Sequence, residues 1–150
     1  MANKLKVGVL GATGMVGQRF VALLEAHPRF EVTAVAASAA SAGKSYADAV
    51  AGRWTLATAV PATTARLTVG NASDVATIAD QVDFVFCAVD MPKDATAKLE
   101  EDYARAETPL VSNNSAHRWT TDVPMMIPEI NAEHASVIEA QQQRVPGIRV

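Results

Sequence analysis

The sequence predicts a single α/β domain built around a doubly wound, mostly parallel β-sheet. Its 150 residues are the size of one ordinary domain. Short apolar runs typical of buried parallel strands alternate with helix-like segments along the chain. A glycine-rich turn at residues 11–17 joins the first of these strands to the first helix. A strand, a glycine-rich turn and a helix in this order are typical of the Rossmann-type nucleotide-binding fold.

The first βαβ unit is expected before residue 38. Residues 4–10 form a short apolar run that leads into the turn, which predicts a buried parallel strand. A helix should follow the turn and end before Pro28, with one apolar stripe at helical spacing. This stripe consists of Val16, Phe20, Leu23 and Leu24. A second strand at residues 31–37 then completes a right-handed crossover.

After the second strand the periodic pattern stops and then resumes. Residues 38–65 are rich in Ala, Ser, Gly and Thr, and predict a long connection with a short helix at 46–50. A third strand is expected at 66–69, and a short helix at 74–79 with Ser73 as its N-cap. The later elements are a buried strand at 83–88, a helix with Pro92 at its first position and Ala95, Leu99 and Tyr103 on one face, a strand at 109–111, a polar loop at 112–119, a helix at 131–143 and the opening of a strand at 146–150.

Composition and charge exclude several classes of partner. The formal net charge is -3 and the chain has no basic stripe, so no nucleic-acid partner is expected. The apolar runs are too short to cross a bilayer and no signal h-region precedes the first strand, which predicts a cytoplasmic protein without a membrane partner. Cys87 is the only cysteine, which rules out an intrachain disulfide and a cysteine-built zinc site. No other metal-ligand spacing occurs, so no metal is expected.

The glycine-rich turn is the first candidate binding site. Glycines at this point let backbone N–H groups and the positive end of the helix dipole face a pyrophosphate. The spacing of the three glycines departs from the commonest dinucleotide fingerprint, and a tight turn that binds no ligand is the alternative. The strand before the turn and the amphipathic helix after it favour a dinucleotide. The cofactor-binding residues predicted here are Gly11, Ala12, Thr13, Gly14, Met15, Val16 and Gly17.

The end of the second strand indicates which dinucleotide is bound. NAD-preferring sites place an Asp or Glu there for the ribose hydroxyls. This chain has Ala36, Ala37 and Ser38 instead, and so presents no carboxylate that would repel a 2′-phosphate. Ser38, Ser41 and Lys44 can donate hydrogen bonds or positive charge to that phosphate, with ordinary loop chemistry as the alternative for the two serines. NADP is therefore the predicted cofactor.

Three segments resemble the aspartate-semialdehyde dehydrogenase family. Residues 11–20, Gly-Ala-Thr-Gly-Met-Val-Gly-Gln-Arg-Phe, have the form of the family's opening turn, and Ser41–Tyr46 is similar to its segment after the second strand. Ser112–Arg118, with Asp122–Pro124 and Ile127–Asn131, is similar to the archaeal and fungal branch, which also includes malonyl-CoA reductases. The resemblance covers almost the whole chain.

The resemblance implies an activity in amino-acid biosynthesis. The family reduces β-aspartyl phosphate to aspartate semialdehyde with NADPH through a cysteine thioester, so the implied partners are an acyl-phosphate or aldehyde substrate and phosphate. Arg118 would bind the phosphate group, and Asn114 would lie near the nicotinamide. Cys87 and Ala88 end a buried strand where the cofactor would pass, and their apolar surroundings predict packing against the core or cofactor instead of nucleophilic attack. His117 is expected to be a packing or loop residue.

Two departures from the family limit what this chain can do. The family commonly has an arginine just before the Ser41 position, where this chain has Ala40. The family's nucleophile lies in an Asn-Cys motif expected beyond Val150, so no catalytic residue is predicted within the chain, which should bind cofactor without turnover. Residues 1–150 are thus expected to be the NAD(P)-binding domain of a homo-oligomeric protein, with the catalytic and dimerisation domain absent. The alternatives are the N-terminal part of an N-acetyl-glutamyl-phosphate reductase or malonyl-CoA reductase, and a non-catalytic nucleotide-sensing module.

Overall fold

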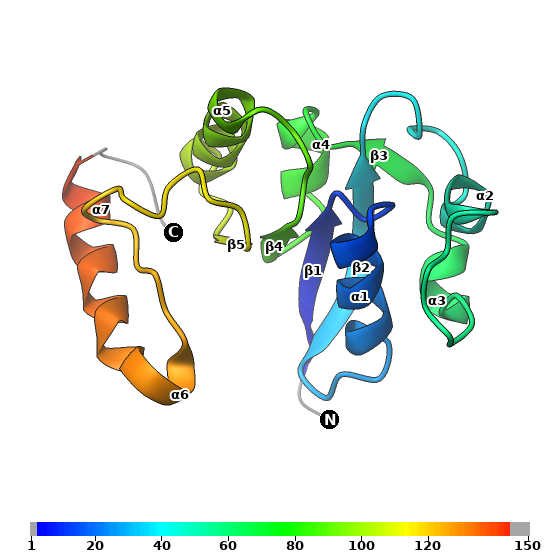
Figure 1. Cartoon of the computed structure of the whole chain (residues 1–150), viewed down its shortest axis with the longest axis horizontal. Coiled ribbons are helices and arrows are strands. Elements are labelled where there is room, and N and C mark those ends of the chain that lie inside the picture. Colours follow the sequence, from blue (N-terminus) through cyan, green and yellow to red (C-terminus); the bar gives the residue numbers. More distant parts are fainter. Residues whose placement is uncertain (1–2, 145–150) are drawn as a thin grey trace.

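A five-stranded sheet lies at the centre of the computed structural model, which describes residues 3–144 (Figure 1). The strands are β1 (Leu5–Leu10), β2 (Phe30–Ala37), β3 (Val69–Asn71), β4 (Phe84–Cys87) and β5 (Leu110–Ser112). Their order is β3-β2-β1-β4-β5, and every neighbouring pair is parallel. The strand order therefore reverses at β1, as in a doubly wound sheet. The predicted Rossmann-type fold class is confirmed.

Helices cover both faces of the sheet. They are α1 (Met15–Leu24), α2 (Tyr46–Val50), α3 (Ala62–Ala65), α4 (Val75–Ala79) and α5 (Lys93–Arg105). Because successive strand residues point to opposite faces, Val9 packs in the core beneath α1 and α2, and Leu10 packs in the core beneath α4 and α5. Figure 1 shows α2 and α3 beside α1, and an arm that contains α6 (Pro128–Asn131) and α7 (Ile138–Arg144) at the other end of the molecule.

α1 buries a different face from the one that its apolar spacing predicts. Leu24 is buried as expected, but Val16 and Leu23 are 41% and 67% exposed. The buried residues of the helix are Gly17, Gln18, Val21 and Leu24. An added Cβ on Gly17 would lie 2.1 Å from the carbonyl oxygen of Gly11, so the helix can approach the turn only through its bare glycine. This close approach, and not the apolar stripe, decides which side of α1 is buried.

The N-caps of α4 and α5 differ from the predicted positions by one residue. Asp74, and not Ser73, caps α4, because its carboxylate accepts a hydrogen bond from the N–H of Thr77. The N–H of Ser73 instead donates to the side chain of Asn71. Pro92 is the N-cap of α5, whose first helical residue is Lys93. Both helices nevertheless occur where the sequence predicts them.

The third strand is displaced from its predicted position at residues 66–69. β3 begins at Val69, because the residues before it pair with the segment that enters α2. The N–H of Tyr46 donates to the carbonyl oxygen of Leu67, and Ser45 forms an isolated antiparallel bridge with Thr68. The predicted short helix at 46–50 is confirmed as α2.

The helix predicted at 131–143 is divided. α6 ends at Asn131, and a 3-10 helix, η1 (Ala132–Val137), connects it to α7. Asn131 has φ -141° and ψ 49°, outside the helical region, and its side chain accepts a hydrogen bond from the N–H of Ile127. The strand expected at 146–150 lies outside the described residues. Within residues 3–144, no helix is both long and apolar enough to span a membrane.

Candidate functional site

The glycine-rich turn leaves the carboxyl end of β1 and fits tightly against β4. Gly11 has φ +76°, and a Cβ there would lie 2.3 Å from the carbonyl oxygen of Ala88. The N–H groups of Gly11 and Ala12 both donate to the carbonyl oxygen of Ala36, which fixes the turn to β2 as well. A Cβ on Gly14, by contrast, would have only the carbonyl oxygen of Gly11 within 4 Å, at 3.4 Å. The turn is therefore closed toward the sheet and open on its outer side.

The N-terminus of α1 is open to an anion. Its N-cap, Gly14, has no side chain to cap the helix, and the first helical hydrogen bond runs from the N–H of Gln18 to the carbonyl oxygen of Gly14. The N–H groups of residues 15–17 thus have no acceptor within the helix. Met15 is 69% exposed, so this end of the helix faces outward. Unpaired amides at the positive end of a helix dipole favour a phosphate or carboxylate.

A buried polar network supports the turn from behind. The hydroxyl of Tyr46 donates to the carbonyl oxygen of Ala12 over 2.8 Å. Gln18 donates through Nε2 to the carbonyl oxygens of Thr13 and Arg53, at 3.0 and 2.9 Å. Its Oε1 accepts from the N–H and the hydroxyl of Thr55, at 2.9 and 3.0 Å. Gln18 is only 1% exposed, and all four hydrogen bonds of its amide are made.

The functional importance of this network was not apparent from the sequence. Apart from the local bond between Gln18 and Thr13, the partners lie 34 to 37 residues apart along the chain, and no periodicity connects them. The one local signal is a glutamine placed directly after Gly17, a position that a helix packed through its glycine must turn inward. Burial raises the pKa of Tyr46 far above that of an ordinary tyrosine, so its hydroxyl keeps the proton that it donates.

The residues predicted to recognise a 2′-phosphate follow β2. Ala36 and Ala37 are buried, while Ser38 and Lys44 are exposed and Ser41 is only 7% exposed. The N–H of Ser41 donates to the carbonyl oxygen of Ser38 over 2.9 Å, which makes a tight turn at the end of the strand. The structure thus leaves the side chains of Ser38 and Lys44 accessible to a ligand at this edge.

A second buried polar cluster lies at the carboxyl ends of β4 and β5. The hydroxyl of Ser112 donates to Oε1 of Glu100 over 2.5 Å. The side-chain Nδ2 of Asn114 donates to the same oxygen at 3.4 Å and lies 3.6 Å from Sγ of Cys87. The backbone N–H of Asn114 donates to the Ser112 hydroxyl. Glu100, on α5, is only 6% exposed, and its role was not predicted from the sequence. This carboxylate and Ser112 hold the start of the polar loop against β4.

Cys87 is a packing residue in this arrangement. Its side chain is fully buried. Burial raises the pKa of the thiol from 9.0 to about 12, and the negative charge of Glu100 adds to the increase. The thiolate needed for nucleophilic attack is therefore almost absent at neutral pH. Ala88 follows directly, and its N–H donates to the carbonyl oxygen of Leu10, so both residues border the glycine turn.

The loop after β5 carries the predicted phosphate-binding residue. Arg118 is exposed, and its guanidinium donates to the carbonyl oxygen of Asn113 over 3.1 Å. His117 contacts the hydroxyl of Thr120 and the carbonyl oxygen of Ala97, as expected for a packing residue. Since the carboxyl ends of parallel strands share one edge, the segments after β1, β2, β4 and β5 that carry the predicted residues all leave the sheet at this edge.

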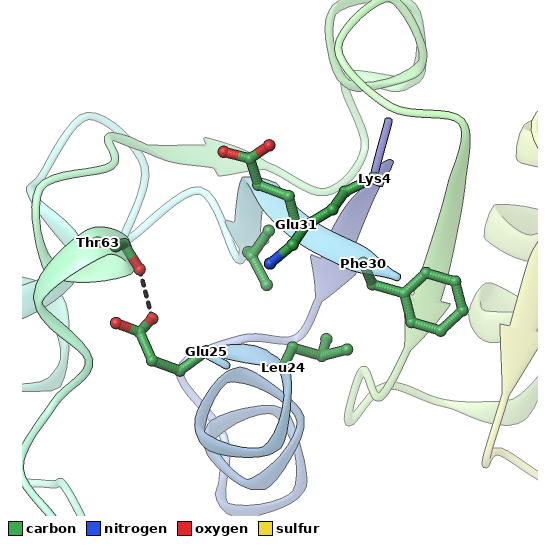
Figure 2. Close-up of a pocket in the computed structure, with 7 residues that line it drawn as sticks. Lys4, Leu24, Glu25, Phe30, Glu31 and Thr63 are labelled. Carbon is green, nitrogen blue, oxygen red and sulfur yellow. Dashed lines mark hydrogen bonds between the residues drawn. The ribbon is translucent and has the colours of Figure 1, made fainter. Parts of the chain in front are cut away.

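A cavity of about 290 Å³ lies elsewhere, at the opposite edge of the sheet (Figure 2). Its lining includes Lys4, just before β1, and Phe30 and Glu31 at the start of β2. Thr63 of α3 donates a hydrogen bond to Glu25 across it, as Figure 2 shows. This cavity contains none of the predicted site residues. Among residues 3–144, no three His, Cys, Asp or Glu side chains are grouped so as to hold a metal ion.

Comparison with known proteins identifies the family of the chain. A family profile described as "Semialdehyde dehydrogenase, NAD binding domain" matches residues 6–138. The aspartate-semialdehyde dehydrogenase of Methanothermobacter thermautotrophicus is 44% identical over 140 residues, which cover 93% of this chain and 38% of that protein. The enzyme of the same name from Schizosaccharomyces pombe is 40% identical over 138 residues, covering 92% and 37%.

A solved structure shows the same relationship. The crystal structure of aspartate-semialdehyde dehydrogenase with NADP from Candida albicans superimposes with a TM-score of 0.83 at 37% identity, and covers 95% of this chain and 38% of that one. The chain thus spans about two-fifths of the length of these relatives. Both the sequence match and the fold support the same conclusion: the chain belongs to the semialdehyde dehydrogenase family and carries its NAD-binding domain.

Proposed function

We propose that this chain is the NADP-binding part of an aspartate-semialdehyde dehydrogenase. The observation that carries the proposal is the open N-terminus of α1 beside a glycine turn at the switch point of the sheet. The archaeal and fungal relatives named above are aspartate-semialdehyde dehydrogenases, which favours this function over an N-acetyl-glutamyl-phosphate reductase, a malonyl-CoA reductase or a nucleotide sensor. We place the protein in the cytoplasm, as the sequence predicts.

The residues of the turn fit a dinucleotide diphosphate. A Cβ on Gly14 would project into the open space in front of the amides of residues 15–17, so the absence of a side chain leaves room for a phosphate. Gly11 and Gly17 serve a different purpose, because they let β1, α1 and β4 approach each other closely. We assign the whole turn to the diphosphate, and Ala88, with the buried Cys87 packed behind it, to the wall along which the nicotinamide half lies.

We infer a preference for NADP over NAD from the end of β2. No carboxylate stands among residues 36–38 to repel a 2′-phosphate. Ser38 and Lys44 are exposed there, and the hydrogen bond from the N–H of Ser41 to the carbonyl oxygen of Ser38 keeps Ser41 at the same end of β2. We therefore assign Ser38, Ser41 and Lys44 to the 2′-phosphate.

In the complete enzyme, bound NADPH would supply hydride for the reduction of β-aspartyl phosphate to aspartate semialdehyde. Arg118 would bind the phosphate group of the substrate, because its exposed guanidinium offers a bidentate fork. Asn114 would orient the nicotinamide from the loop that Glu100 holds in place. We place the cysteine nucleophile outside residues 1–150, since Cys87 is buried and protonated. We propose that the dimerisation domain also lies outside them, because the chain spans only about two-fifths of the relatives' length.

Isothermal titration calorimetry of the 150-residue chain with NADP and with NAD tests this proposal. We expect NADP to bind more tightly than NAD, and no reduction of substrate by the chain alone. Absence of heat with both cofactors would contradict the proposal. The Gly14→Leu variant provides a control. We expect it not to bind NADP, because the added side chain occupies the space in front of the helix amides.

A further inference from the structure

The 2′-phosphate site assigned above contains little positive charge. Lys44 is the only cation among residues 36–45, at and after the end of β2. A bound 2′-phosphate adds one to two negative charges at neutral pH. Another cation near the glycine turn would therefore strengthen binding.

Arg53 is such a cation, and a buried network holds it beside the turn. Its guanidinium Nη2 donates to the hydroxyl of Thr13 over 3.2 Å, and its carbonyl oxygen accepts from Nε2 of Gln18 over 2.9 Å. Thr13 and Gln18 are 6% and 1% exposed, so the two points that fix Arg53 belong to the core. Arg53 itself is exposed. The position of its backbone is thus fixed while its side chain remains accessible.

The charge of Arg53 is not neutralised within the described part of the chain. The ion pairs between residues 3 and 144 involve only Lys98 and Arg105. The single side-chain hydrogen bond of Arg53 goes to a neutral hydroxyl. A guanidinium has five N–H donors, so several remain for a ligand. The core thus fixes a cation that has no carboxylate partner and lies beside a proposed phosphate site. This is the arrangement expected of a phosphate-binding residue.

The position of Arg53 favours the 2′-phosphate over the diphosphate. The diphosphate already has the amides at the N-terminus of α1. The ribose 2′ position of a dinucleotide is recognised at the end of β2. The hydrogen bond to the Thr13 hydroxyl places the guanidinium of Arg53 beside the glycine turn, and the N–H groups of Gly11 and Ala12 join that turn to the end of β2 at Ala36. We propose that Arg53 binds the 2′-phosphate of NADP and thereby adds a second positive charge to that of Lys44; this assignment rests on the proposed function.

The test compares Arg53→Gln with a matched control, Arg29→Gln, in the 150-residue chain. Arg29 is also exposed and lies directly before β2, at the opposite edge of the sheet, so its loss removes the same charge away from the proposed site. Calorimetry should measure the affinity of each variant for NADP, for NAD and for 2′,5′-ADP, which carries the 2′-phosphate without the nicotinamide. We expect Arg53→Gln to weaken NADP and 2′,5′-ADP by roughly tenfold to a hundredfold, the usual cost of losing a hydrogen bond to a charged group. NAD binding should change by less than about twofold, and Arg29→Gln should bind like the parent.

The remaining outcomes separate the two proposals. A parent chain that binds neither cofactor contradicts the proposed function and this assignment with it. A parent that binds NADP while Arg53→Gln binds it equally well contradicts the role of Arg53 alone. Equal losses for NADP and NAD show that Arg53 acts on the turn through Thr13, and overturn the assignment to the 2′-phosphate. Arg53→Lys keeps the charge and should recover part of the NADP affinity, and thermal melting of each variant verifies that it is folded.

Discussion

The hydroxyl of Tyr46 donates a hydrogen bond to the carbonyl oxygen of Ala12 over 2.8 Å, and both residues are fully buried. This contact joins α2 to the glycine turn across 34 residues of sequence. A backbone carbonyl inside the core requires a donor, and no strand or helix partner is available in the middle of a tight turn. The tyrosine thus fixes the glycine turn from within the core.

Replacing Tyr46 with phenylalanine should weaken both the fold and cofactor binding. Loss of the hydroxyl leaves the Ala12 carbonyl buried without a donor, which costs about 1–3 kcal/mol of the free energy of unfolding. The turn then gains freedom, so affinity for NADP should fall by a few fold. Urea denaturation and calorimetry measure the two effects.

Tyr103→Phe provides the matched control. Its hydroxyl donates to the carbonyl oxygen of Ala72 over 2.9 Å, and its side chain is equally buried, but it lies on the other face of the sheet. We expect a similar loss of stability and unchanged NADP affinity. If both variants bind NADP like the parent, Tyr46 has no positioning role in the turn.

Gly14 and Gly17 should respond to alanine in opposite ways. A Cβ on Gly17 would lie 2.1 Å from the Gly11 carbonyl oxygen, so Gly17→Ala should destabilise the chain by about 2 kcal/mol or more. A Cβ on Gly14 would meet that oxygen at 3.4 Å, and Gly14 has an ordinary φ of -78°, so Gly14→Ala should fold with nearly the stability of the parent. Its NADP affinity should nevertheless decrease, because the methyl group faces the proposed phosphate. Thermal melting and calorimetry distinguish these results, and normal binding by Gly14→Ala would refute the proposed place of the diphosphate.

Cys87 should be unreactive in the folded chain. Its pKa of about 12 and its complete burial predict that a thiol reagent at pH 8 labels Cys87 only after denaturation. The folded state holds this proton more tightly than the unfolded state does. The resulting contribution to stability is therefore complete below the ordinary thiol pKa of 9.0 and decreases as the pH rises from there toward about 12. Rapid labelling of the native chain would contradict the buried position of Cys87.

Removing the Glu100 carboxylate should loosen the loop after β5. Glu100→Ala leaves the Ser112 hydroxyl and the Asn114 amide without this acceptor, and should cost about 1–3 kcal/mol of stability. Hydrogen exchange at residues 112–118 should increase. Glu101 is the neighbouring control, because its carboxylate forms an exposed ion pair with Arg105, and Glu101→Ala should change stability by less than about 1 kcal/mol. Equal exchange in the two variants would show that Glu100 does not hold the loop.

The strands and the glycine turn could be predicted because their signals are local. The run of residues 7–10 is buried on both faces of the parallel sheet, and the glycines mark the turn directly. The buried side of α1 could not be predicted from apolar spacing, since Val16 and Leu23 fit the helical period and yet are exposed. The approach of Gly17 to the Gly11 carbonyl, which is a contact between elements, determined that side.

The polar residues of the site were hardest to predict. Gln18 is buried because its partners stand at residues 13, 53 and 55, and Glu100 because Ser112 and Asn114 donate to it. Nothing in the sequence around a single polar residue indicates a hydrogen-bond partner far along the chain. Such a residue is normally expected on the surface. The glycine turn that carries the candidate site could therefore be located from its motif, whereas the side chains that support the turn became visible only in the fold.

The contact between Gly11 and the end of β4 also affects the thermodynamics of binding. A Cβ at Gly11 would lie 2.3 Å from the Ala88 carbonyl oxygen, so the turn and this strand end touch backbone to backbone and have little freedom to shift against each other. The two surfaces proposed for the diphosphate and the nicotinamide half are consequently at a set separation before any ligand arrives. The entropy cost of ordering these two surfaces relative to each other is incurred when the chain folds and not when a ligand binds. A dinucleotide would therefore meet a preorganised site.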